Sequence, residues 1–204
     1  MTASLTALMI NCTLKPSPGL SSGDVLGGQV LAALGRHGVV SDTVRAVDSR
    51  ILPGVEADMG EGDEWPRLRR AVLDADILVF VTPTWLGQHS SVAQRVLERL
   101  DAELGETDGA GRPILFDRVA IPVVVGNEDG AHHITAILAQ ALGDVGFTIP
   151  AQASVYWNGE AMQKTDYREL DATPEPVATA IETAAANAAH LAGLLRGAPY
   201  PSQA

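Results

Sequence analysis

The sequence is poor in cysteine, in positive charge and in long apolar runs. Cys12 is the single cysteine among 204 residues, which excludes an internal disulfide and a zinc or iron–sulfur cage held by one chain. Lys and Arg number 14 against 25 Asp and Glu, for a net charge of −11, which disfavours nucleic acid and anionic membrane surfaces as partners. No segment is long and apolar enough to span a bilayer. We therefore expect no membrane and no nucleic-acid partner.

The N-terminal stretch also lacks the features of a targeting segment. Residues 7–10 form a short apolar core without a basic flank, which is not the pattern of a signal peptide. We therefore expect a cytoplasmic protein. The length suits one compact domain over residues 1–204, with a core of about 4–157, an irregular segment at 158–173 and a C-terminal helix at 174–196.

Apolar runs typical of buried strands alternate with helical patterns along the chain. The expected strands lie at 5–11, 39–47, 77–81, 119–125 and within 147–156. The expected helices lie at about 22–37, from 63, from 91, around 134–142 and at 174–196. This alternation predicts an α/β fold: a three-layer sandwich with a five-stranded parallel sheet, right-handed crossovers and an extra C-terminal helix.

The segment 75–104 shows the repeating unit most clearly. Residues 77–81, I-L-V-F-V, have the apolar, β-branched pattern of a strand covered on both faces. Residues 82–87, T-P-T-W-L-G, are predicted to end the strand and to expose one large aromatic side chain. Ser91 then begins a helix, with Gln94 three positions on as the second half of a capping box.

Three polar loops follow the ends of predicted strands. They occupy residues 12–23, 82–90 and 126–133. The pattern does not give the strand order. If the order is 2-1-3-4-5, strands 1, 3 and 4 are neighbours, and ligands of open parallel sheets bind at the carboxyl ends of the strands. The three loops are therefore predicted to meet in one crevice.

The first loop has the groups that bind a phosphate. It precedes a helix, whose N-terminal N–H groups and partial positive charge attract anions. Its candidate ligands are hydroxyls and one cation, namely Thr13, Lys15, Ser17, Ser21 and Ser22. The loop matches neither the P-loop nor the dinucleotide-binding glycine pattern, and hydroxyls before a helix also serve as ordinary caps.

The second loop offers a flat aromatic surface. Trp85 is predicted to be exposed at a strand end, where stacking on a planar heterocycle would account for it. Gly87 allows a close approach of the backbone. In the alternative interpretation, Trp85 packs against neighbouring loops or a second subunit.

The third loop, G-N-E-D-G-A-H-H, follows a buried strand. Its N–H groups, Asn127 and the two histidines are suited to hydrogen-bond the polar rim of a ring system. Its acidic and imidazole side chains also permit a metal-site interpretation, without a supporting pattern nearby, and acids at a helix start commonly complement the helix dipole. These side chains are Glu128, Asp129, His132 and His133. We predict no metal.

Cys12 lies beside the end of the first strand. A thiol there is a possible nucleophile, but no paired base is evident, and a small buried apolar side chain is the favoured interpretation. Together the loops offer a site for a planar phosphorylated ring and few acid–base groups, which suits chemistry carried out by a cofactor.

The loops resemble those of a known family. The segment T-P-T-W-L-G-Q-H-S-S resembles the flavin-ring loop, roughly T/S-P-x-[YWR]-x-G-x-x-[SP], of the flavodoxin-like NAD(P)H-dependent FMN reductases and quinone reductases. The segment C-T-L-K-P-S-P-G-L-S-S-G occupies the place of their phosphate loop, and V-V-V-G-N-E-D-G-A-H-H that of their third loop. The resemblance covers roughly residues 4–157 and implies a flavodoxin-like fold with strand order 2-1-3-4-5.

The resemblance also assigns roles to residues. Thr13, Lys15, Ser21 and Ser22 would surround the FMN phosphate. The isoalloxazine would be lined by Pro83, Thr84, Trp85, Leu86 and Gly87. The pyrimidine and ribityl side would be bordered by Gly126, Asn127, Glu128, Asp129 and Gly130. His133 or His132 would steady negative charge on the flavin.

The implied function is an FMN-dependent oxidoreductase. NAD(P)H would give a hydride to bound FMN, and a quinone, a flavin or a similar small acceptor would then take the electrons. The family also suggests a homodimer or a homotetramer. Two other functions stay open: a flavodoxin-type electron carrier, which the acidic balance favours, and a non-catalytic flavodoxin-like binding module.

Overall fold

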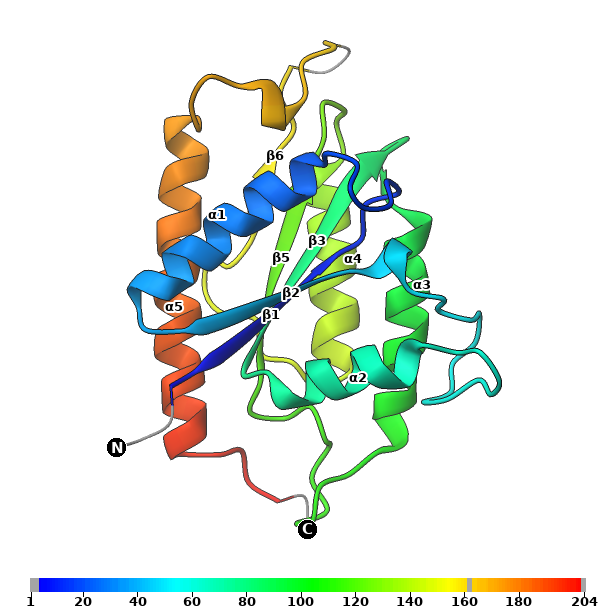
Figure 1. Ribbon diagram of the computed structural model, residues 1–204. Helices are drawn as coiled ribbons and strands as arrows, with labels where there is room; N and C mark the ends of the chain where they lie inside the picture. The colour runs from blue at the N-terminus through cyan, green and yellow to red at the C-terminus, as the bar shows by residue number, and fades with distance from the viewer. Residues whose placement is uncertain (1–3, 161–162, 203–204) are drawn as a thin grey trace.

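The computed structural model describes residues 4–160 and 163–202. Figure 1 shows a twisted sheet with helices on both faces. The strands are β1 (Thr6–Asn11), β2 (Val40–Arg45), β3 (Ile77–Trp85), β4 (Gln88–His89), β5 (Val119–Val125) and β6 (Val155–Trp157). The α-helices are α1 (Ser22–Arg36), α2 (Trp65–Asp74), α3 (Ser91–Leu100), α4 (Ala131–Asp144) and α5 (Glu175–Gly197). Short 3-10 turns are η1 (Ala46–Asp48), η2 (Asp101–Gly105) and η3 (Tyr167–Glu169).

The parallel sheet has the strand order β2-β1-β3-β5-β6. This is the predicted flavodoxin-like order 2-1-3-4-5 once β4 is set aside, and the prediction of the fold class is confirmed. β4 is an antiparallel addition that pairs with the end of β3. Because β1, β3 and β5 are neighbours, the loops at their carboxyl ends lie at one end of the molecule, which is the upper end in Figure 1.

Two apolar layers cover the two faces of the sheet. Alternate side chains of a strand point to opposite faces, so Met9 packs toward α1 and α5, whereas Ile10 packs toward α2, α3 and α4. Val79 and Phe80 divide in the same way on β3. Burial on both faces explains why the central strands are continuous apolar runs.

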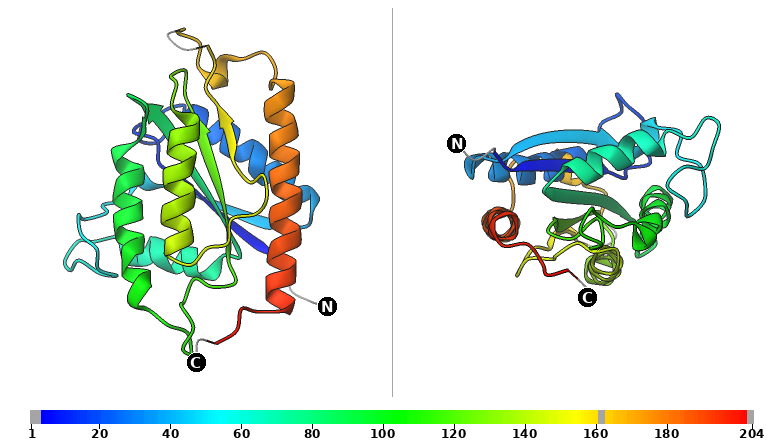
Figure 2. Two further views of the ribbon diagram at one scale, coloured as in Figure 1. Left: turned by 180° about the vertical axis from the view of Figure 1, so that it is seen from behind. Right: turned by 90° about the horizontal axis from the view of Figure 1, so that it is seen from below.

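Helix α5 is the C-terminal addition that the sequence predicts. It packs on α1, β5 and β6, and Figure 2 shows it running along the side of the molecule next to β6. Its buried stripe is rich in small residues, which allow the close approach, and includes Ala184, Ala185, Ala188 and Ala192. No helix in the described part of the chain combines the length and apolarity needed to cross a membrane.

Two local expectations around β3 are wrong. The strand does not end before Thr82 but runs to Trp85, because Thr82 and Pro83 pair with β5 and the next two residues pair with β4. The cap of α3 is Ser90 instead of Ser91: the Ser90 side chain accepts a hydrogen bond from the N–H of Ala93 at 3.0 Å. The extension of β3 depends on strands that are distant in sequence. The position of the cap depends on a choice between two adjacent serines.

Candidate functional site

The three predicted loops converge on one crevice at the carboxyl ends of β1, β3 and β5. An acidic and an aromatic residue from η3 and its flank complete the crevice. It is lined by Thr13, Leu14, Lys15, Ser21, Ser22, Gly23, Pro83, Thr84, Trp85, Val125, Gly126, Asn127, Trp157, Asp166 and Tyr167. The crevice encloses about 90 Å³, so a ligand larger than this volume leaves part of its surface open to solvent.

One end of the crevice is formed by the start of α1. Ser21 caps the helix, with its hydroxyl accepting from the N–H of Gly23 at 3.1 Å. Gly23 is required here because a Cβ atom would lie 2.7 Å from Asn11 Oδ1. The buried Thr13 and the exposed Lys15 lie next to this helix end. Hydroxyls, a helix N-terminus and one ammonium group together favour an anionic ligand.

The first loop is held in place from two sides. Arg45, at the end of β2, donates to the carbonyl oxygens of Lys15 at 3.1 Å and Gly19 at 2.8 Å, and it pairs with Asp24. On the other side, the Ser90 hydroxyl donates to the carbonyl oxygen of Cys12 at 2.6 Å. The cap of α3 therefore joins the first loop to the second.

The second loop presents one flat and one polar group. The indole of Trp85 is 49% exposed, as the sequence predicts. Thr84 is 4% exposed, and its hydroxyl has no hydrogen-bond partner among the described residues. A buried hydroxyl without a partner costs free energy, so Thr84 Oγ1 is a candidate hydrogen-bonding group for a ligand in the crevice.

The second and third loops are in direct contact. The N–H of Leu86 donates to Glu128 Oε2 at 2.7 Å. Gly130 has a φ of +131°, and a Cβ atom there would lie 2.8 Å from the Cα of Gly87. These two glycines let the loop backbones touch, so the second and third loops act as one wall.

Eight predicted residues do not line the crevice. They are Ser17, Leu86, Gly87, Glu128, Asp129, Gly130, His132 and His133. Leu86, Gly87, Glu128 and Gly130 form the contact between the loops, and Asp129 Oδ1 accepts from the N–H of Gly130 at 2.7 Å. The carboxylates of Glu128 and Asp129 therefore each accept a hydrogen bond from a backbone N–H group.

Ser17 and the histidines have partners outside the crevice. Ser17 donates to Asp48 from its hydroxyl at 2.5 Å and its N–H at 2.8 Å, and these hydrogen bonds hold the pKa of Asp48 below its usual range. His133 Nε2 lies 3.2 Å from Gln88 Oε1, and His132 Nε2 lies 2.8 Å from the hydroxyl of Tyr156. Across residues 4–160 and 163–202, no three His, Cys, Asp or Glu side chains are grouped to hold a metal.

Two aromatic residues of the crevice were missed by the sequence interpretation. Trp157 ends β6, and its ring lies 5.4 Å from that of Tyr167 between centroids. Tyr167 is fixed to α1 because its hydroxyl donates to Gln29 Oε1 at 2.6 Å. The one sequence signal is the capping box made by Asp166 and Glu169, which predicts a turn within 158–173 without showing where it packs.

Cys12 is fully buried, as the favoured interpretation of the sequence predicts. Burial raises the pKa of its thiol. A thiol that stays protonated is a poor nucleophile, so Cys12 serves as a small core side chain under the first loop.

Comparisons with known proteins agree with this geometry. The sequence model of the family described as NADPH-dependent FMN reductase matches residues 5–161. A protein of Streptomyces davaonensis described as 8-demethyl-8-aminoriboflavin-5'-phosphate synthase is 32% identical, with 96% of this chain and 80% of that protein aligned. A Mycobacterium bovis protein described as the divalent metal cation transporter MntH is 46% identical over 161 residues. That match covers 77% of this chain but spans only 24% of the length of the MntH protein.

Solved structures show the same fold. A crystal structure of RosB with the bound intermediate 8-demethyl-8-formylriboflavin-5'-phosphate superposes with a TM-score of 0.87 at 30% identity, covering 97% of this chain and 82% of RosB. The NAD(P)H:acceptor oxidoreductase FerB of Paracoccus denitrificans has a TM-score of 0.60 at 15% identity, covering 94% and 98% of the two chains. The FerB likeness supports the fold alone.

Proposed function

This chain belongs to the NADPH-dependent FMN reductase family, and from that premise we propose that it transfers electrons from NAD(P)H to a quinone, a flavin or a similar small acceptor. The family binds FMN and uses NAD(P)H, which confirms the predicted cofactor and co-substrate. One observation carries the proposal: three loops far apart in sequence form a single crevice with a helix N-terminus at one end and an exposed indole in its wall.

The residues of the crevice fit an FMN molecule. Ser21, Ser22 and the start of α1 suit the phosphate, and Trp85 suits one face of the ring. The unpartnered hydroxyl of Thr84 can hydrogen-bond the polar edge of the ring. Because the crevice encloses only about 90 Å³, part of a bound FMN would stay open to solvent, as a reaction with two successive small molecules requires.

When bound, FMN supplies hydride acceptance and electron transfer, and the protein supplies binding and orientation. The chain's own contribution is to hold the three loops fixed before the ligand arrives. Ser90 fixes the first loop to the second, and the contact between Gly87 and Gly130 fixes the second to the third. The carboxylates of Glu128 and Asp129 accept hydrogen bonds from backbone N–H groups and do not line the crevice.

The absorption spectrum of the purified chain tests the cofactor, and steady-state NADPH oxidation with a quinone tests the activity. We expect flavin bands and turnover without a partner protein. An electron carrier would show negligible turnover without a partner reductase, and a binding module would stay colourless after incubation with FMN.

Trp85→Ala should weaken FMN binding by about fivefold, because aromatic stacking contributes roughly 1 kcal/mol and the variant loses it. Unchanged affinity and unchanged flavin fluorescence quenching would remove Trp85 from the ring site.

A second candidate function is favoured by a specific observation. The sequence match at 32% identity is named for a flavin 5'-phosphate altered at position 8, and the solved structure at 30% identity has such a flavin 5'-phosphate bound. Each match covers nearly the whole of this chain. In this alternative, flavin 5'-phosphate in the crevice is the substrate. Mass analysis of FMN recovered after incubation with dioxygen and an amino donor separates the two: a changed mass favours the alternative, and an unchanged mass with NADPH turnover favours the reductase.

We also expect the chain to form a homodimer or a homotetramer. Leu86 and Leu20 are neighbours in sequence of the crevice residues Trp85 and Ser21, and they are 92% and 72% exposed. Exposed apolar residues that gather on one surface commonly mark an interaction site. Light scattering coupled to gel filtration measures the assembly. Replacement of Leu86 by Glu should then shift it toward the monomer.

A further inference from the structure

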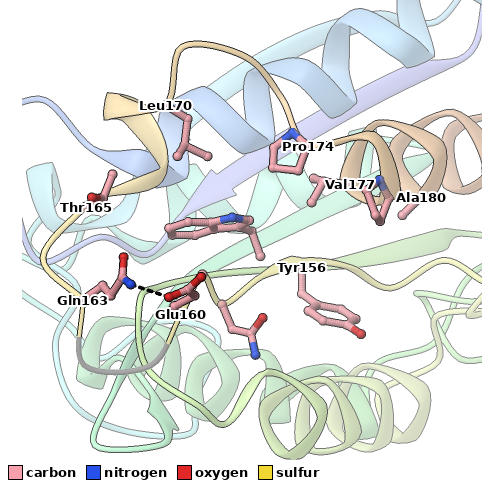
Figure 3. Close-up of a pocket in the computed structure, with 12 residues that line it drawn as sticks. Tyr156, Glu160, Gln163, Thr165, Leu170, Pro174, Val177 and Ala180 are labelled. Atoms are coloured by element: carbon pink, nitrogen blue, oxygen red, sulfur yellow. Dashed lines mark hydrogen bonds between the residues drawn. The ribbon is translucent and has the colours of Figure 1, made fainter.

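A second hollow adjoins the crevice and has no role so far. It lies between the end of β6, residues 158–160 and 163–170, and the start of α5, and it has a volume of about 550 Å³. Figure 3 shows Leu170, Pro174, Val177 and Ala180 along one wall and Tyr156 along the opposite one. A volume of this size is within the range of ordinary small-molecule sites, about 300–1,000 Å³.

Trp157 is common to both spaces, because it lines the crevice and this hollow. Its ring is held in position by two neighbours. A Cβ atom on Gly159 would lie 2.8 Å from the edge of the indole, and the ring of Tyr167 lies 5.4 Å away between centroids. Trp157 is thus a shared wall, and the hollow, named here the Trp157 pocket, lies directly beside the crevice.

The lining of the Trp157 pocket selects against charged ligands. Among its described lining residues there is no Lys or Arg, and the single charged group, Glu160, is anionic and hydrogen-bonded by Gln163. The diphosphate of a nicotinamide cofactor would therefore find no counter-charge here. Proline, leucine, valine and alanine side chains instead offer apolar contact.

We propose that the Trp157 pocket binds the apolar substituent of a neutral quinone acceptor whose ring is reduced in the crevice. This inference rests on the proposed reductase function and names its acceptor. NAD(P)H is the electron donor, and the quinone gains two electrons and two protons, the second proton coming from solvent. The pocket takes no part in bond making. It supplies binding energy from a part of the substrate remote from the reacting ring.

The test compares a 1,4-naphthoquinone with the same ring carrying a short alkyl chain. The wild-type enzyme should have a kcat/KM about tenfold higher for the alkylated quinone, the gain expected for burying about two methylene groups. Ala180→Trp fills the pocket and should abolish this preference. Thr179→Trp adds the same side chain at the neighbouring exposed position of α5 and should keep it. Ala180→Leu is the milder variant if Ala180→Trp folds poorly.

Two controls keep the outcomes distinct. FMN affinity and turnover with ferricyanide, which needs no apolar pocket, should be the same in all variants. Equilibrium dialysis of a redox-inert alkylnaphthalene with FMN-loaded protein measures the pocket without turnover, and Ala180→Trp should weaken this binding about tenfold. Absence of NADPH oxidation with every acceptor would refute the proposed function. A wild type without alkyl preference, or a preference and dialysis binding that survive in Ala180→Trp, would refute the Trp157 pocket as the acceptor site.

Discussion

Two threonines of β3 show how a single hydroxyl can belong to the fold or to the site. The hydroxyl of Thr82 donates to the carbonyl oxygen of Pro83 at 3.1 Å and accepts from the N–H of Ser90 at 3.0 Å. Thr84, two residues later, is equally buried, but no described residue hydrogen-bonds its hydroxyl. Thr82 therefore stabilises the second loop, whereas the Thr84 hydroxyl has the proposed role of hydrogen-bonding a ligand.

We expect valine to separate these two roles. Thr84→Val should leave the free energy of unfolding of the ligand-free protein within about 1 kcal/mol of wild type, because no protein hydrogen bond is lost. It should weaken FMN binding by about fivefold, because one hydrogen bond worth roughly 1 kcal/mol is lost. Thr82→Val should instead destabilise the ligand-free protein by about 1–3 kcal/mol. Denaturant unfolding and fluorescence titration measure both, and unchanged FMN affinity in Thr84→Val would exclude its hydroxyl from the site.

A buried ion pair makes the stability of the chain pH-dependent. Asp63 and Arg99 have fully buried side chains, 2.7 Å apart between Oδ2 and the guanidinium. Burial alone would raise the pKa of Asp63. The hydrogen bond from Arg99 and those from the N–H groups of Met59, Leu52 and Trp65 outweigh burial and hold this pKa well below its usual range. Stability from this carboxylate is therefore present above the unfolded-state pKa of about 4 and is lost as pH falls below it.

Asp63→Asn should lower the free energy of unfolding at pH 7 by about 3 kcal/mol, because it leaves the buried guanidinium without its counter-charge. The variant should also lose less stability than wild type between about pH 5 and pH 3, since the titrating group is gone. Urea unfolding at several pH values gives both results. Parallel pH profiles for the two proteins would show that folding does not lower the pKa of Asp63.

At the scale of elements, the contact between the second and third loops depends on glycine. Gly130→Ala should separate them, because its Cβ would lie 2.8 Å from Gly87 Cα, and φ of +131° is unfavourable for alanine. We expect at least about tenfold weaker FMN binding and about 1–3 kcal/mol lower stability. Gly143→Ala in α4 is the matched control, since nothing lies within 4 Å of its added Cβ, and it should stabilise by about 0.5–1 kcal/mol. Equal FMN affinity in the two variants would contradict the role of the contact.

The elements themselves were predictable where their cause is local. Three apolar runs marked β1, β3 and β5, an alternating pattern marked β2, and the alternation with helices gave the layers. The fifth strand was expected within 147–156, whereas β6 spans only Val155–Trp157. The end of β3 was not predictable, because Thr82 to Trp85 extend it only by pairing with β5 and with β4. The cap of α3 was misplaced by one position because Ser90 and Ser91 are equivalent in local sequence, and only the contact of Ser90 with Cys12 distinguishes them.

The crevice also has parts that could be predicted from the sequence and parts that could not. The first three loops were found from the sequence because each directly follows a strand whose position in the sheet sets where it lies. Trp157 and Tyr167 were missed because the segment 158–173 returns to the crevice through distant contacts, such as that of Tyr167 with Gln29. Leu86 and Glu128 were expected to face the ligand, whereas their mutual hydrogen bond gives them a role within the wall.

At the scale of the whole molecule, one ligand is expected to stabilise elements that the sequence separates. The proposed phosphate site is on α1, and the proposed ring site is on β3 and β5, with Trp157 of β6 at the margin. FMN in the crevice would therefore connect the first half of the sheet to the second. A ligand that binds only the folded chain stabilises it by mass action, by about 2.7 kcal/mol at a concentration 100 times its Kd.

We expect FMN at that excess to raise the Tm of the ligand-free protein by roughly 5–10 °C, from about 2–4 °C per kcal/mol for a chain of this size. Riboflavin at the same concentration has the ring but no phosphate, so it should give a clearly smaller shift. Ser21→Ala should reduce the difference between the two ligands, because Ser21 both lines the crevice and caps α1. Differential scanning calorimetry measures all of these shifts. Equal shifts with FMN and riboflavin would place the phosphate away from the N-terminus of α1, although the ring could still lie against Trp85.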